Sequence, residues 1–503
     1  MQQENLCAGK LKLTVDRAGQ SPRLRFYNTK TGDELFPQEL FTLVFRNTGK
    51  QEHTLSSNSC KVESIDTSEN SITLVLANEE FRFRFRLWAG NGDFFHAQAV
   101  LLAAPNKITI DRLIYFTSAI HPDDFRWSIP MPEHRVHIPK YIMTLGQPVY
   151  LRSFYMGGEF PTCDNKIHGN TAQCTVYCGR PFGELRTPDG NTPFHSCVIG
   201  AADEKGYDAC HNAFFTYMRT FARPERFRLQ FNSWYDNMLD IDSHNIAESF
   251  RAVEKGLREH GVRPLDSYVV DDGWVDYKKS AFWAFREERF PHGFQEEKKL
   301  MEELGSGFGV WFGPRGGYTE QNSYAKKLKK IGYFRCRQSF DICTGAPKYI
   351  NALIDRMIEF MRAYNVNYFK LDGFSAQACR SNKHGHPAGG KEQKGVYYYT
   401  FLWEQWLAGF ERLRAVNPDV YLNLTSYSHC SPWFLKWVDA VWINNSADMY
   451  YEGDGSNLDQ CLNYRDGRYY DYYIVRQQQF PASFIYNHEP CYGKKNYNPP
   501  AAR

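Results

Sequence analysis

The sequence predicts a multidomain β and α/β protein in which an N-terminal β-sandwich is followed by a (β/α)8 TIM-type barrel. Short alternating segments bounded by turn residues fill the chain up to about residue 221, which is typical of antiparallel strands. After a linker at 222–226 the period changes, and strands alternate with helices through seven units. So many units in one direction favour a closed barrel over a doubly wound sheet. We therefore predict two domains, at 1–222 and 223–503.

The N-terminal part is dominated by a period of two. The clearest segment is FRFRFRLWA at 81–89, in which phenylalanines alternate with arginines and therefore occupy opposite faces of a strand. Similar segments are KLKLTV at 10–15, RLRFYN at 23–28 and SITLVLA at 71–77. Helical patterning is nearly absent before residue 221, so we expect half-buried antiparallel strands there.

The barrel prediction depends on the order of strands and helices after the linker. The expected strands are 226–234, 267–274, 307–314, 367–373, 420–425, 440–444 and 482–487. The expected helices are 246–261, 296–304, 323–332, 347–366 and 397–416. An eighth strand is not evident before Arg503. It lies either in the irregular stretch near Cys491 or in a continuation of the natural protein, and we favour the second, a barrel truncated at its C-terminal end.

The composition is that of an ordinary globular protein. The 503 residues include 60 lysines and arginines against 57 aspartates and glutamates, and 42% are hydrophobic. Because no basic excess or cluster is present to neutralise a phosphate backbone, we expect no nucleic-acid partner. The longest apolar run, AQAVLLAAP at 97–105, is less than half of the roughly 20 residues that cross a bilayer, so we expect no membrane span.

The amino terminus and the cysteines carry little functional signal. The start, MQQENLCAGK, lacks the charged residues and apolar stretch of a secretory signal, and periplasmic, secreted and cytoplasmic locations all stay open. Thirteen cysteines are spread over the chain, and the closest pair, Cys174 and Cys178, lacks partners at zinc-site spacing. We expect buried thiols and no metal site. The polar segment at 381–395, which contains two histidines, is interpreted as a mobile loop over a cleft, with metal binding as the less favoured alternative.

Polar and aromatic side chains follow the predicted barrel strands where each strand ends. Catalytic groups of a parallel barrel lie at the carboxyl ends of its strands, so these residues are the candidates for a site. They are four carboxylates, one lysine and three tryptophans, namely Asp271, Asp272, Asp372, Asp448, Lys370, Trp234, Trp274 and Trp311. In addition, Ser426 ends the fifth strand and Asn445 follows the sixth.

This set of residue types is that of a glycosidase cleft. Carboxylates accept hydrogen bonds from sugar hydroxyls, a lysine donates to them, and indole rings cover the apolar face of a pyranose. Two carboxylates also perform displacement and proton transfer, about 5–5.5 Å apart when the anomeric configuration is retained. A single aspartate at a strand end is more often a helix N-cap, but four together on alternate elements favour a site.

Four motifs in a fixed order carry a resemblance to a known group of enzymes. NSWYD, VVDDGW, FGVWFGP and YFKLDG follow one another between residues 232 and 373. In this order they resemble the α-galactosidase-like clan of glycoside hydrolases, and most closely glycoside hydrolase family 36. The resemblance covers about residues 226–490. It implies an N-terminal β-supersandwich, a (β/α)8 barrel and a C-terminal β-domain, of which the last is expected to be missing here.

The resemblance also implies roles for individual residues. The aspartate of the K-x-D strand would be the nucleophile, Asp372, and the lysine two before it, Lys370, would bind galactose hydroxyls. The paired aspartates of the D-D-G-W segment, Asp271 and Asp272, would hold the 4- and 6-hydroxyls. Trp234 and Trp311 would line the sugar site. From their places at strand ends alone, we also expect Trp274, Ser426 and Asn445 to bind substrate.

The acid/base is assigned from the run after the sixth strand. Family 36 has W-x-S-D-x-T-D there, and a gapless placement puts its first aspartate on Asn445 and its second on Asp448. An asparagine does not deliver a proton as a carboxylic acid does. The other branch of the clan has an S/F-A-D ending, which matches Ser446-Ala447-Asp448 directly. We assign Asp448 and keep Asn445 as the alternative.

These features predict a retaining, exo-acting α-glycosidase that removes terminal α-linked galactose or N-acetylgalactosamine from oligosaccharides or glycoconjugates. The C-x-x-G-G-G-R tract of family 36 is replaced by TSYSHCSPWFLKW at 425–437, so the choice between the two sugars stays open. No cofactor and no metal are expected, and a homo-oligomer is kept open. The alternatives are a transglycosylase of the raffinose-synthase type and a carbohydrate-binding relative without catalysis.

Overall fold

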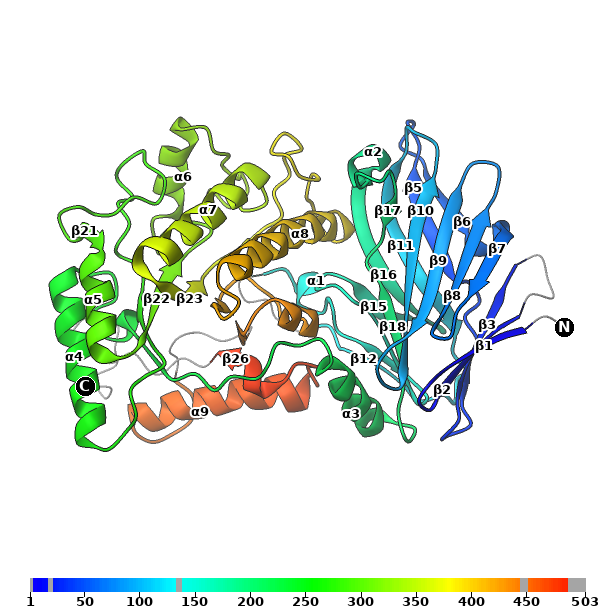
Figure 1. Cartoon of the computed structure of the whole chain (residues 1–503), viewed down its shortest axis with the longest axis horizontal. Coiled ribbons are helices and arrows are strands. Elements are labelled where there is room, and N and C mark those ends of the chain that lie inside the picture. The colour runs from blue at the N-terminus through cyan, green and yellow to red at the C-terminus, as the bar shows by residue number, and fades with distance from the viewer. Residues whose placement is uncertain (1–2, 17–20, 133–137, 444–450, 487–503) are drawn as a thin grey trace.

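The computed structural model describes residues 3–16, 21–132, 138–443 and 451–486. Antiparallel strands gather in the N-terminal part, drawn in blue to cyan, and helices surround parallel strands in the part drawn in green to red (Figure 1). Among the described helices, none combines the length and the apolarity needed to cross a bilayer.

The N-terminal strands form three antiparallel sheets. A four-stranded sheet contains β1 (Gln3–Ala8), β2 (Leu11–Asp16), β3 (Arg23–Asn28) and β4 (Glu34–Leu35). A five-stranded sheet contains β15 (Asp164–His168), β16 (Thr171–Pro181), β11 (Thr109–Ala119), β5 (Phe41–Arg46) and β6 (Glu52–Ser56). The largest contains β12 (Arg126–Ser128), β13 (Val149–Leu151), β14 (Phe154–Gly158), β18 (Cys197–Ala201), β10 (Phe94–Ala103), β9 (Arg82–Ala89), β8 (Ser71–Ala77) and β7 (Lys61–Thr67), with β17 (Thr192–Pro193) beside β10.

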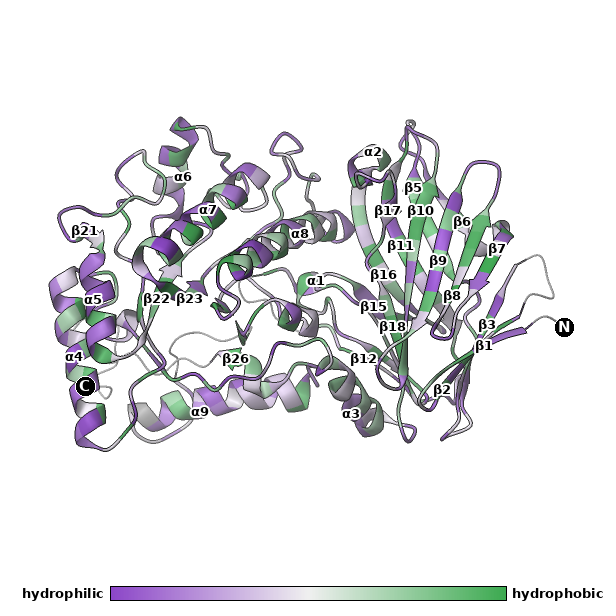
Figure 2. Cartoon of the chain, in the orientation of Figure 1, coloured by the Kyte–Doolittle hydropathy of each residue, from purple (hydrophilic) through white to green (hydrophobic). Residues whose placement is uncertain are grey.

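Strand β9 confirms the predicted alternation. Phe83 and Phe85 are fully buried, whereas Arg82, Arg84 and Arg86 are exposed, so one face of the strand packs on the core and the other meets water. Figure 2 shows the resulting alternation of green and purple along the strand. The ring of Phe83 lies 4.6 Å from that of Phe41 in the five-stranded sheet. Side chains of two sheets therefore share this core.

The second part contains the seven predicted strands, all parallel. Within the described residues their order in one sheet is β19 (Gln230–Asn232), β20 (Ser267–Val270), β22 (Gly307–Phe312), β23 (Val366–Leu371), β24 (Tyr421–Leu424), β25 (Ala440–Trp442) and β26 (Ile485–Tyr486). A further short strand, β21, spans Pro291–Phe294. Sequence order equals spatial order along the whole sheet, as the repeated strand and helix units predict. Closure by an eighth strand stays a prediction.

Helices connect and cover these strands. In the described residues they are α1 (Lys140–Met143), α2 (Phe182–Leu185), α3 (Tyr207–Met218), α4 (Ser243–Glu259), α5 (Gln295–Leu304), α6 (Gln321–Lys330), α7 (Pro347–Tyr364), α8 (Gln393–Val416) and α9 (Asn457–Tyr470). All five predicted helices are present. The expectation that helices are nearly absent before residue 221 is wrong for α3, whose sequence YDACHNAFFTYM buries Phe214 and Tyr217 against the largest sheet.

Local chemistry fixes the ends of the helices that follow the strands. Helix α4 begins earlier than predicted because Asp242 and Asn245 form a reciprocal capping box at its start. Helix α7 begins with Pro347. Proline is tolerated there because a backbone N–H in the first turn of a helix has no acceptor within the helix. The helix is ended by Asn365, which has a left-handed conformation.

A buried carboxylate ties the linker to the parallel sheet. Asp439 precedes β25 and is 4% exposed. It accepts hydrogen bonds from the guanidinium groups of Arg223 at 3.1 Å, Arg226 at 3.2 Å and Arg414 of α8 at 2.8 Å. The backbone N–H of Leu422 in β24 donates to it at 2.9 Å. One side chain therefore joins the linker, α8, β24 and β25.

Replacing Asp439 tests this connection. We expect Asp439→Ala to lower the free energy of unfolding by about 1–3 kcal/mol, because three half-buried guanidinium groups and the Leu422 N–H lose their acceptor. The measurement is urea denaturation followed by fluorescence. The control is Asp419→Ala, since Asp419 is exposed and lies 3.8 Å from Arg226; we expect a change below about 0.5 kcal/mol. Equal stabilities of the two variants would contradict the role given to Asp439.

Candidate active site

The parallel register brings the predicted site residues together. Trp311 of β22 is the register partner of Lys370 in β23, and Leu371 is the partner of Leu424 in β24. Asp271 follows β20, Asp372 follows β23 and Ser426 follows β24, so all of them reach the same edge of the sheet.

A buried ion pair lies at the centre of this edge. Lys370 Nζ donates to Asp271 Oδ2 at 2.8 Å, and the two side chains are 4% and 3% exposed. The backbone N–H of Asp271 donates to Ser233 Oγ at 2.9 Å, which holds the aspartate against the end of β19. Burial alone lowers the pKa of Lys370, but attraction by Asp271, Tyr486 and Asp372 raises it above its ordinary value. The lysine is therefore a fixed positive charge beside two carboxylates.

Asp372 is held as an ionised, partly exposed carboxylate. Trp311 Nε1 donates to its Oδ2 at 3.3 Å, and the backbone N–H of Ser426 donates to its Oδ1 at 3.3 Å. The Ser426 hydroxyl donates to the same oxygen. Burial raises the pKa of Asp372, but the Lys370 charge and the hydrogen bonds from Ser426, Thr425 and Trp311 outweigh burial and lower it below its usual range. This geometry orients a charged carboxylate at the end of β23.

Asp272 has a different environment from its neighbours. It is fully buried, and Oδ1 accepts hydrogen bonds from the Gly273 N–H at 2.7 Å and the Tyr277 hydroxyl at 2.6 Å. The Tyr318 N–H donates to Oδ2. Burial and the charge of Asp271 raise the pKa of Asp272 from 3.8 to about 7, against the effect of these donors. Asp272 therefore organises the loops that carry Tyr277 and Tyr318.

The three tryptophans lie in different places. Trp311 contacts Asp372, and Trp234 packs edge-to-face on Tyr318 with ring centroids 5.2 Å apart. Trp274 is fully buried, and its Nε1 donates to the carbonyl oxygen of Trp311 at 3.2 Å. Its ring packs between the sheet and α7, against Trp283, Phe285, Phe294, Phe312 and Phe360. The structure thus places Trp274 in the core and not with the other site residues.

The remaining two predicted residues lie outside the described residues. Asn445 and Asp448 belong to 444–450, so the contacts of the predicted acid/base are not described. The residues that the structure brings together are Asp271, Asp272, Lys370, Asp372, Trp311, Ser426 and, through Tyr318, Trp234.

Sequence reasoning missed an arginine that supports the rim of the site. The Arg315 guanidinium lies over the ring of Tyr427, 4.1 Å from its centroid, and pairs with the buried Asp341. The backbone N–H of Arg315 donates to the carbonyl oxygen of Gly373, the residue after Asp372, at 3.1 Å. Tyr427 has a φ of 62°, a conformation that a tyrosine keeps only when its surroundings fix it. The signal available in the sequence was the GPRG run at 313–316, which overlaps the end of a predicted barrel strand.

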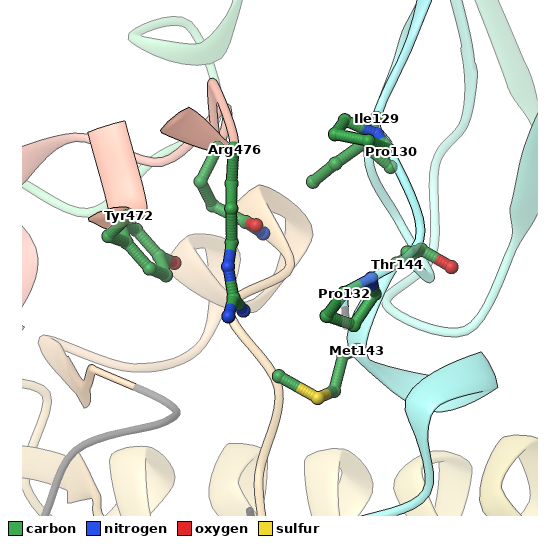
Figure 3. Close-up of a pocket in the computed structure, with 8 residues that line it drawn as sticks. Ile129, Pro130, Pro132, Met143, Thr144, Tyr472 and Arg476 are labelled. Atoms are coloured by element: carbon green, nitrogen blue, oxygen red, sulfur yellow. The ribbon is translucent and has the colours of Figure 1, made fainter. Parts of the chain in front are cut away.

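A separate pocket lies where the N-terminal part meets the end of α9. Ile129, Pro130, Pro132, Met143 and Thr144 face Tyr472 and Arg476 across it (Figure 3). Its lining includes Gln478 but no carboxylate and none of the strand-end residues described above. This pocket therefore does not belong to the candidate active site.

The raised pKa of Asp272 leads to a prediction about stability and pH. The unfolded chain releases this proton near 3.8 and the folded chain near 7, so the stabilisation is complete below pH 4 and is lost as the pH rises through 7. We expect the free energy of unfolding of Asp272→Asn to fall less steeply than wild type between pH 4 and 7, by up to about 1.4 kcal/mol per pH unit.

Urea denaturation at half-unit pH steps measures this difference. The Asn variant loses stability at every pH because one of its amide donors faces the Tyr318 N–H, so the slope and not the absolute value is compared. Tyr277→Phe serves as the matched variant. It removes a donor to the ionised form, and we expect it to extend the decline to higher pH. Parallel curves for wild type and Asp272→Asn would contradict the buried, titrating carboxylate.

Comparison with curated proteins finds similarity to α-galactosidases. No model of a known protein family matches the chain. α-Galactosidase Mel36A from Lactobacillus acidophilus is 20% identical over 208 residues, which are 38% of this chain and 26% of the relative. α-Galactosidase 1 from Pediococcus pentosaceus is 19% identical over 191 residues, which are 35% of this chain and 25% of the relative. The matched part thus spans about a quarter of the length of these curated relatives.

Solved structures share the fold over most of the chain. The family 36 α-galactosidase AgaB from Geobacillus stearothermophilus has a TM-score of 0.62 at 13% identity and covers 88% of this chain and 74% of its own. The galactosidase domain of the α-galactosidase-sucrose kinase AgaSK has a TM-score of 0.63 at 13% identity, with coverages of 88% and 73%. Together with the curated matches, this shows that the chain is a relative of the glycoside hydrolase family 36 α-galactosidases.

Proposed function

We propose that the protein is a retaining, exo-acting α-glycosidase that releases terminal α-linked galactose from oligosaccharides or glycoconjugates. The observation that carries the proposal is Asp372, a partly exposed carboxylate whose pKa is lowered and whose two oxygens accept hydrogen bonds from Trp311 and Ser426. A nucleophile must be ionised and oriented before substrate arrives, and this carboxylate is both. The curated relatives are named α-galactosidases, which supports the sugar.

The strand-end residues supply what a galactose site requires. Asp271 and Lys370 form a buried donor and acceptor pair beside the nucleophile, suited to neighbouring sugar hydroxyls. The indole ring of Trp311 lies at the carboxylate and provides an apolar surface. Asp272 shapes the site through the loop that carries Tyr318. Variants of the related AgaA are described in complex with raffinose and with stachyose, which supports an oligosaccharide substrate.

The proposed mechanism is a double displacement. An oxygen of Asp372 attacks the anomeric carbon, and the bond from that carbon to the leaving oxygen breaks as a carboxylic acid protonates the oxygen. In the second step the same acid, now a carboxylate, takes a proton from water, whose oxygen displaces Asp372 and releases the sugar with its original configuration. The fixed charge of Lys370 keeps free Asp372 ionised before the attack and favours its departure as a carboxylate in the second step.

Asp448 is the proposed acid/base, with Asn445 as the alternative position. The assignment comes from the resemblance of Ser446-Ala447-Asp448 to the ending found in one branch of the clan. If Asn445 occupied the position instead, the chain would lack the proton donor that ordinary leaving groups need. A carbohydrate-binding protein without turnover is the function that this second placement favours.

The proposal includes the full architecture. We propose a β-supersandwich at 1–222 and a (β/α)8 barrel from residue 223. The seven parallel strands would be seven of the eight strands of that barrel. The change from antiparallel to parallel pairing between β18 and β19 supports the boundary. Helix α8 supports close packing of the two parts, since Glu404 accepts hydrogen bonds from Arg180 of β16 at 2.6 Å and pairs with His195 at 3.1 Å.

Replacing the proposed nucleophile is the direct test. We expect Asp372→Asn to lower kcat/KM for p-nitrophenyl α-galactoside by about 10³-fold or more, because an amide does not form the glycosyl-enzyme. The matched control is Asp276→Asn, which changes another largely buried aspartate at the same edge of the sheet, and we expect it to keep turnover. Intact turnover in Asp372→Asn, with both variants folded by circular dichroism, would refute the assignment.

The stereochemical course and the acid/base have their own test. Proton NMR of the first sugar released from the galactoside and from its N-acetylgalactosaminide analogue should show the α-anomer. The substrate that is hydrolysed faster identifies the preferred sugar. We expect azide to rescue Asp448→Ala on an activated phenyl glycoside. An initial β-anomer would exclude double displacement, a mixture of products with added acceptor sugar would indicate a transglycosylase, and binding without release would indicate an inactive relative.

A further inference from the structure

Two cysteines and two histidines converge beside the candidate site. Cys343 comes from the segment between α6 and α7, and Cys379, His384 and His386 come from the segment between β23 and α8. One possible ligand atom from each lies within 4.8 Å of all the others. Cys343, Cys379 and His386 are buried, and His384 is half-buried. We call these four residues the Cys2His2 cluster.

Two of the separations within the cluster are close to those of a tetrahedral metal site. Cys343 Sγ lies 3.1 Å from His386 Nε2, and Cys379 Sγ lies 3.4 Å from His384 Nδ1. A zinc ion with sulfur at about 2.3 Å and nitrogen at about 2.0–2.1 Å separates those two ligand atoms by about 3.5 Å. These two separations differ from the zinc geometry by a few tenths of an ångström at most, and every other pair of ligand atoms lies within 4.8 Å.

The contacts of His386 orient its Nε2 atom towards the other ligand atoms of the cluster. Its Nδ1 lies 2.9 Å from the carbonyl oxygen of Pro387, which accepts only from a protonated nitrogen. In the neutral ring this leaves the lone pair on Nε2, the atom that faces Cys343 Sγ. The ring is fixed further by an edge contact with Tyr398, at 4.9 Å between centroids, and His384 stacks on Phe334 at 4.4 Å. Both imidazoles are therefore oriented before any metal arrives.

The ligand types select one class of metal. Two thiolates and two neutral imidazoles suit Zn²⁺, and together they balance its charge, so the buried site would be neutral. No carboxylate belongs to the cluster. Four protein ligands fill a tetrahedron and leave no position for water or substrate, which is the composition of a structural site and not of a catalytic one.

We propose that the protein binds one structural Zn²⁺ through Cys343 Sγ, Cys379 Sγ, His384 Nδ1 and His386 Nε2. The ion joins two segments that are neighbours in space but separate in sequence. One of them runs from the nucleophile Asp372 to the start of α8, a length that is uncommon for a connection without secondary structure. The other contains Asp341, the partner of Arg315. Zinc would thus fix the two segments that support the rim of the candidate site.

Metal content tests this proposal without reference to activity. Chain purified from zinc-supplemented culture and dialysed is analysed by plasma mass spectrometry, and we expect about one zinc per chain. Cys379→Ala and His386→Ala should contain about a tenth of that or less, measured on folded, monodisperse protein. Cys60→Ala is the matched control, since Cys60 is a buried cysteine of the N-terminal sheets, and it should keep the full content.

Cobalt gives a readout of the ligands themselves. Replacing the metal by Co²⁺ should produce visible absorption typical of a tetrahedral ion and a sulfur-to-cobalt charge-transfer band, both lost in Cys379→Ala. If the alanine variants fail to fold, this spectrum and the zinc content of the wild type still decide the question. Less than about 0.1 zinc per chain without a cobalt spectrum would overturn the proposal. So would a disulfide joining Cys379 to Cys336 or Cys343, detected by peptide mass spectrometry.

Discussion

The site depends on a single constraint, the parallel alignment that brings the carboxyl ends of β20, β22, β23 and β24 to one edge. A lysine and an aspartate that are 99 positions apart can form a buried pair only because two strands end at the same level. Taking both charges out of water is unfavourable unless each has its partner, so the pair in turn fixes the level at which the strands meet. Asp372, the proposed nucleophile, follows two residues after that lysine, and its position is therefore set by the sheet.

Neighbouring carboxylates acquire opposite properties from their surroundings. The pKa of Asp372 is lowered by a positive charge and several hydrogen-bond donors, whereas Asp272 is enclosed and lies beside another aspartate, so its pKa rises to about 7. The same chemical group is thus a charged carboxylate at one strand end and part of the loop framework at another. Residue type alone does not distinguish the two, because burial and neighbours decide.

Much of the fold could be predicted from sequence, because local patterning and chain order determine it. The alternation in FRFRFRLWA and the repeated strand and helix units identified β9 and all seven parallel strands. Where a side chain points proved harder. Trp274 and Trp311 both end strands, yet one packs in an aromatic core and the other meets Asp372. Helix α3 was missed because its aromatic residues obscure the period. The Cys2His2 cluster was missed because Cys343 lies in another segment, before α7, whereas Cys379, His384 and His386 lie between β23 and α8.

The carboxylate of Asp439 also has a consequence for how the chain assembles. Its arginine partners in the linker precede it by 216 and 213 positions, so during synthesis the linker leaves the ribosome long before its anchor exists. The N-terminal sheets depend mainly on local hairpins and can form first, but their attachment to the second part must await α8, β24 and β25. Docking of the two parts is thus a late event in biogenesis, and an interrupted chain that ends before residue 439 would carry an unanchored linker.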